Sequence, residues 1–98
     1  MKTFDKAVEQ HLDKLELFVP VVARVHGEHH PEFHDFKKVY DEMIKKIKNA
    51  DSGRPDLEED FKQLRVISDD YTVPGDVCES YEAVFQMVAE LDQAYREQ

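Results

Sequence analysis

The sequence predicts an all-α protein, an antiparallel four-helix bundle. Apolar residues recur at three- and four-residue spacings in four separate segments, which is the period of a helix with one buried face. Proline and glycine lie mostly between these segments, and no segment alternates apolar with polar residues long enough to form a strand. We expect helices near residues 4–27, 31–49, 55–69 and 76–97, with residues 1–98 in one domain.

The first helix is predicted from an apolar stripe that runs from Phe4 to His26. Pro20 lies inside this segment, where it should kink the helix, because proline cannot donate the usual backbone hydrogen bond. Gly27 suits the left-handed position that closes a helix. The residues of the stripe are Phe4, Val8, Leu12, Leu15, Val19, Val22 and His26.

The second and third helices each open on a proline, Pro31 and Pro55, which fits the first turn of a helix. In the fourth segment, Asp76 and Glu79 are spaced as a capping box that would begin the last helix. Three phenylalanines, each in the middle of a stripe on a different helix, are expected in the core: Phe36, Phe61 and Phe85.

Composition excludes several classes of protein. The 13 basic and 22 acidic residues give a net charge of −9, which disfavours nucleic acid as a partner. No apolar run is long enough to span a membrane, and we expect no secretory signal, so the predicted location is the cytoplasm. A single cysteine, Cys78, cannot form an intramolecular disulfide.

The histidines are the main candidates for chemistry, because four of the five lie between residues 26 and 34. Imidazole is the commonest metal ligand, so His26, His29 and His30 are the candidate metal ligands of this chain. His26 lies near the centre of the apolar face of the first helix. We therefore expect it to be buried and hydrogen-bonded to a carboxylate or a tyrosine hydroxyl of a facing helix.

Two other histidines have simpler interpretations. His34 lies beside the apolar stripe of the second helix, and we expect it to face solvent. His11 is about 22 Å from His26 along the first helix, so the two cannot share an ion within one chain. Cys78 lies near the start of the fourth helix, where the helix N-terminus would favour its thiolate. We favour the simpler interpretation, a small apolar residue that fills space beside Val77 and Tyr81.

Two stretches of this chain resemble the hemerythrin-like proteins that repair iron–sulfur centres, the RIC family. The first is VARVHGEHHPEF, residues 22–33, and the second is LRVISDDYTVPGDVC, residues 64–78. They occur in the order that the family has, and with the helices between and after them the resemblance covers most of the chain. It implies a hemerythrin-like four-helix bundle, a fold that in the family holds two irons on five histidines and two glutamates.

Most of those family ligands are absent from this sequence. His26 matches the histidine that ends the family's first helix, but Asp5 stands where the earlier histidine would be. The His-x-x-x-Glu pair of the second helix would fall at residues 50–54 and the next histidine at residues 54–56, and neither occurs. The last His-x-x-x-Glu would begin near Gln98, where this sequence stops.

We therefore expect a non-catalytic protein with an accessory or interaction role in iron or nitrosative stress, and no resident cofactor. The protein partner is unknown, and a homodimer is left open. The alternative is a weak binder or carrier of a single metal ion, iron, that uses the cluster from His26 to His34. A di-iron enzyme is disfavoured, because such a centre needs carboxylates and imidazoles from all four helices.

Overall fold

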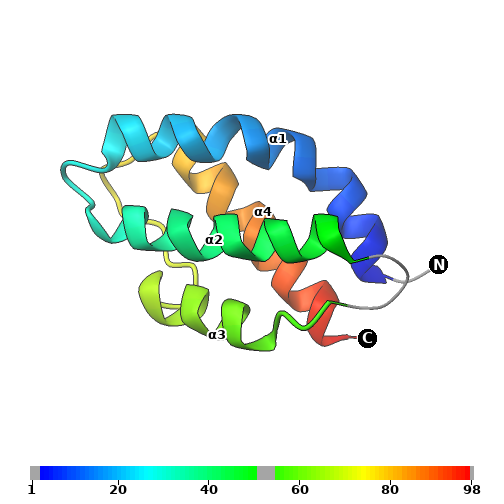
Figure 1. The fold of residues 1–98 in the computed structure, drawn as a ribbon. Coiled ribbons are helices and arrows are strands. Elements are labelled where there is room, and N and C mark those ends of the chain that lie inside the picture. The colour runs from blue at the N-terminus through cyan, green and yellow to red at the C-terminus, as the bar shows by residue number, and fades with distance from the viewer. Residues whose placement is uncertain (1–2, 51–54, 98) are drawn as a thin grey trace.

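The computed structural model describes residues 3–50 and 55–97, and it contains four helices and no strand within those ranges. The helices are α1 (Thr3–His26), α2 (Glu32–Asn49), α3 (Glu58–Ile67) and α4 (Glu79–Arg96). Successive helices run in opposite directions, so the described ends of the chain lie at one end of the molecule (Figure 1). The predicted four-helix bundle is confirmed. None of the described helices is long and apolar enough to cross a membrane.

The four helices pack as two neighbouring pairs. α4 lies mainly against α1, and α3 lies against α2, with further contacts between α1 and α2 (Figure 1). The three predicted core phenylalanines are all buried, as expected from their places in the stripes. The helical period therefore identified the buried face of each helix correctly.

Aromatic rings fill both ends of this core. Near the end of α1, the ring centroids of Phe36 and Phe85 are 4.9 Å apart, and those of Tyr81 and Phe85 are 5.0 Å apart. At the opposite end, Phe4 and Phe61 pack on Tyr95, with centroids at 5.3 and 5.4 Å. Such offset and edge-to-face pairs add about 0.5–1.5 kcal/mol each to the stability that burial supplies.

Two helix starts differ from the prediction, and the first has a distant residue as its cause. α3 begins at Glu58, not at Pro55, because Tyr95 of α4 holds the preceding segment: the Leu57 N–H donates to the Tyr95 hydroxyl (2.8 Å), which donates to the Pro55 carbonyl (3.0 Å). α4 begins at Glu79 with Cys78 as N-cap and no side-chain cap, so the predicted capping box of Asp76 and Glu79 is wrong.

The predicted left-handed glycine is also wrong. No described glycine has a positive φ, and the Gly27 N–H donates to the Ala23 carbonyl, which continues the helical path of α1. A glycine is required at this position for a different reason, because a Cβ on Gly27 would collide with the ring of His34. Pro20 lies within α1 and does not end the helix.

Candidate functional site

His26 lies at the last residue of α1, where it meets the start of α4. Its Nε2 is 3.1 Å from the Sγ of Cys78, and its ring packs edge-on against Tyr81 at a centroid distance of 5.6 Å. The expected full burial is wrong, because His26 is half-buried. The expected partner is also wrong: a thiol occupies the position predicted for a carboxylate or a tyrosine hydroxyl, because Cys78 is the residue that caps α4.

His30 connects the two loops at this end of the bundle. Its Nδ1 is 3.2 Å from Oε2 of Glu32, and its Nε2 is 3.0 Å from Oδ1 of Asp76. Each ring nitrogen therefore faces one carboxylate, so His30 links the start of α2 to the loop before α4. The ring also packs against Tyr81, at 5.8 Å, so His26 and His30 share one aromatic neighbour.

The remaining histidines take different positions. His29 and His34 are exposed, and the His34 ring lies over Gly27. His11 is buried on α1, and its Nε2 is 3.0 Å from Oε1 of Glu90 on α4. Among the described residues, no three histidine, cysteine or acidic side chains are grouped to hold a metal ion. The site predicted at His26, His29 and His30 remains a prediction.

The residues present do not fit a di-iron centre like the one in the family that the chain resembles. Such a centre needs imidazoles and carboxylates that converge from all four helices. Here the buried ionisable side chains are each paired at a different place: His11 with Glu90, Asp60 with Lys46 at 2.8 Å, and Asp92 with Arg65. Aromatic and aliphatic side chains fill the space between the helices.

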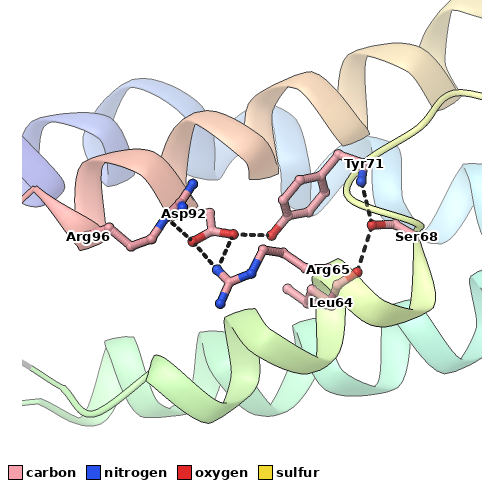
Figure 2. A network of polar contacts seen from close by, with 6 residues as sticks. All are labelled: Leu64, Arg65, Ser68, Tyr71, Asp92 and Arg96. Carbon is pink, nitrogen blue, oxygen red and sulfur yellow. Dashed lines mark hydrogen bonds and ion pairs between the residues drawn. The ribbon is translucent and has the colours of Figure 1, made fainter.

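The most completely buried charge, Asp92 of α4, was not anticipated from the sequence (Figure 2). It is 0 % exposed, and Nη1 of Arg65 lies 2.8 Å from both of its oxygens. The Tyr71 hydroxyl donates to Oδ2 at 2.7 Å, and Nε of Arg96 is 3.3 Å from Oδ1. These partners compensate the desolvation of the carboxylate and tie α3 and the following turn to α4.

The turn that carries Tyr71 has an unusual backbone. Asp69, Asp70 and Tyr71 all have left-handed φ angles, of 54°, 58° and 61°. Ser68 supports this path, since its hydroxyl donates to the Leu64 carbonyl and accepts from the Tyr71 N–H (Figure 2). Asp tolerates this conformation better than most residues, so the Asp-Asp pair was the only local signal of it.

Three tyrosines titrate above their ordinary range. Burial, followed by the negative charges of Glu32 and Asp76, raises the pKa of Tyr81 to about 12. Burial raises the pKa of Tyr71 as well, and the hydrogen bond to Asp92 adds to this effect. Burial also raises the pKa of Tyr40, whose hydroxyl has no hydrogen-bond partner among the described residues.

These shifts predict that the protein loses stability in alkali. The ordinary pKa of the phenol is 10.0, so the unfolded chain releases protons above pH 10 that the folded chain retains. The stability linked to Tyr81 is thus fully present below pH 10, and it falls by about 1.4 kcal/mol per pH unit as the pH rises toward its folded pKa. Urea denaturation followed by circular dichroism between pH 9 and pH 12 measures the slope.

Tyr40→Phe provides the matched comparison. Because the variant removes a buried hydroxyl without a partner, we expect it to raise the free energy of unfolding at pH 7 by about 1 kcal/mol and to flatten the alkaline slope. If the free energy of unfolding of the unmodified chain does not change between pH 9 and pH 12, the assignment of these tyrosines as buried in the folded state is contradicted.

Comparisons with known proteins give no significant match among family models, curated proteins or solved structures.

Proposed function

We propose that this chain is a small non-catalytic hemerythrin-like protein, related to the RIC proteins, with an accessory or interaction role in iron or nitrosative stress in the cytoplasm. The proposal rests on the two stretches, residues 22–33 and 64–78, that resemble this family. The four-helix architecture is the one that the resemblance implies.

The non-catalytic part of the proposal is supported by what occupies the bundle interior. Phe33, Phe36, Tyr81 and Phe85 pack against one another between the helices in stacked, tilted and edge-on pairs, with centroid distances between 4.9 and 6.3 Å. A di-iron centre would need polar ligands in a bundle interior of this kind. Aromatic packing instead gives a stable scaffold whose surface is free to bind other molecules.

Metal reconstitution tests the proposal directly. Protein purified without a histidine tag would receive Fe(II) under anaerobic conditions and then be exposed to air, while its absorption spectrum is recorded. We expect substoichiometric iron and no oxo-bridged absorption. An oxo-bridged band with two irons per chain would contradict a non-catalytic role and restore the di-iron enzyme.

The role in stress needs a separate test in the source organism. We expect cells that lack this chain to regain iron–sulfur enzyme activity more slowly after exposure to nitric oxide. Expression of the chain with His26→Leu should restore the normal rate, since no step of the proposed role uses this histidine as a metal ligand. Recovery that is unchanged in the absence of the chain would contradict the role.

A single-metal binder is the second candidate, and the contact between His26 and Cys78 favours it. The distance of 3.1 Å from Nε2 to Sγ places a thiol, a strong ligand for zinc and iron, beside an imidazole. Cys78 is exposed, and His30 lies on the same Tyr81 ring, so further ligands are close. Movement of these side chains would be needed to form a complete site.

His26→Leu distinguishes the two candidates. Under the first proposal, the substitution leaves the metal content unchanged and alters only the stability, because the Cys78 contact is lost while apolar area is gained. Co(II) titration measures binding, since a thiolate ligand would give an intense near-ultraviolet charge-transfer band. His34→Leu is the matched control, because His34 is exposed. If only His26→Leu abolishes stoichiometric binding, the single-metal candidate replaces the first.

A further inference from the structure

The outward face of α1 carries an apolar stripe that is open to solvent. Leu17 is 65 % exposed and Val25 is 55 % exposed, and Val21 between them is partly exposed. The three residues are spaced by four, so they lie on one face of the helix and extend over about 12 Å. Only one other large hydrophobic residue is as exposed in the described ranges, Val66 on α3.

Opposite charges flank this stripe. Lys14 lies three residues before Leu17, and Glu28 lies three residues after Val25; both are exposed. Glu28 lies in the turn that follows α1, and two backbone bonds, from the Gly27 N–H to Ala23 and from the His30 N–H to His26, hold this turn against the end of the helix. The face therefore runs from a cation through three apolar residues to an anion.

This arrangement is complementary to itself. If a second α1 lies antiparallel with a two-fold axis at Val21, Leu17 faces Val25 of the second copy and Lys14 faces its Glu28. A two-fold axis repeats both contacts, so one patch supplies both halves of the interface. A parallel pairing in register would instead oppose Lys14 to Lys14 and Glu28 to Glu28, which is unfavourable.

From this geometry we propose that the outer face of α1 binds a second copy of this chain in an antiparallel dimer. The inference does not depend on the proposed function. The patch is narrow, and each copy carries a net charge of −9, so the dimer is a weak one. At physiological ionic strength the screening length is about 8 Å, so salt weakens the long-range repulsion between the two chains more than the close contact between Lys14 and Glu28.

Sedimentation equilibrium from about 1 µM to 1 mM protein tests the dimer. We expect a monomer–dimer equilibrium in this range that Leu17→Ser or Val25→Ser weakens by about tenfold or more. Val66→Ser is the matched control, since Val66 is equally apolar and 76 % exposed but lies off the stripe. A monomer over the whole range, or an equal effect of Val66→Ser, would overturn the proposal.

The charges test the orientation. Lys14→Glu and Glu28→Lys should each weaken dimerisation several-fold, whereas the double variant, which exchanges the two charges, should restore it. Val21→Cys in a Cys78→Ser background should also form an intermolecular disulfide on air oxidation, because the two-fold axis places the residue opposite itself. Failure of the double variant to restore the dimer would overturn the antiparallel arrangement.

Discussion

Replacing Asp92 with alanine is expected to lower the free energy of unfolding by about 3 kcal/mol. The substitution leaves Arg65 without the carboxylate that its Nη1 contacts at 2.8 Å, and it removes the acceptor of the Tyr71 hydroxyl. We expect the lower end of the range for broken buried ion pairs, because the Arg65 side chain is 28 % exposed and water can partly solvate it. Guanidinium denaturation followed by circular dichroism measures the change.

Asp60→Ala is the matched control for this prediction. Asp60 is also a buried carboxylate, but its partner Lys46 is about half exposed, so its loss should cost only about 1 kcal/mol. A double-mutant cycle with Arg65→Met should show a coupling energy above about 1 kcal/mol between Arg65 and Asp92. A loss of no more than about 1 kcal/mol at Asp92, with no coupling to Arg65, would show that the Asp92 network does not stabilise the fold.

Phe85→Ala should destabilise the protein by about 3–5 kcal/mol, the usual cost of a large cavity in a core. Phe85 is buried, and its ring packs on Phe36 at 4.9 Å, on Tyr81 at 5.0 Å and on Phe33 at 6.3 Å. Domains of this size have a total stability of about 5–15 kcal/mol, so the variant should be close to unfolding at room temperature. Thermal and urea unfolding both measure this loss.

Val66→Ala serves as the control for the core variants. Val66 is exposed, so its truncation should change stability by no more than about 0.5 kcal/mol. Phe36→Ala and Phe61→Ala should behave like Phe85→Ala, since each removes a buried ring on a different helix. A loss below about 1 kcal/mol at all three positions would mean that the apolar stripes do not form the core.

The sequence by itself determined the four helices and their buried faces. Phe36, Phe61 and Phe85 could be placed in the core because burial of a helix face follows the 3.6-residue period, which is a local property of the chain. The candidate site was anticipated only in part: His26 does lie at the end of α1, and His34 does face solvent. The first conclusion needed only the end of the apolar stripe, and the second needed only the angle of one residue about one helix.

The tertiary structure alone decided which polar groups meet. His26 and Cys78 are 52 residues apart in the chain, and Arg65 and Asp92 are 27 apart, so no local spacing relates them. The same reason explains the helix starts, because Tyr95 holds the segment before α3 and His30 contacts Asp76, which the local pattern assigned to a capping box. A polar side chain bonds to the partner that packing brings within about 3 Å. The spacing of residues within one segment does not determine how that segment packs against distant helices.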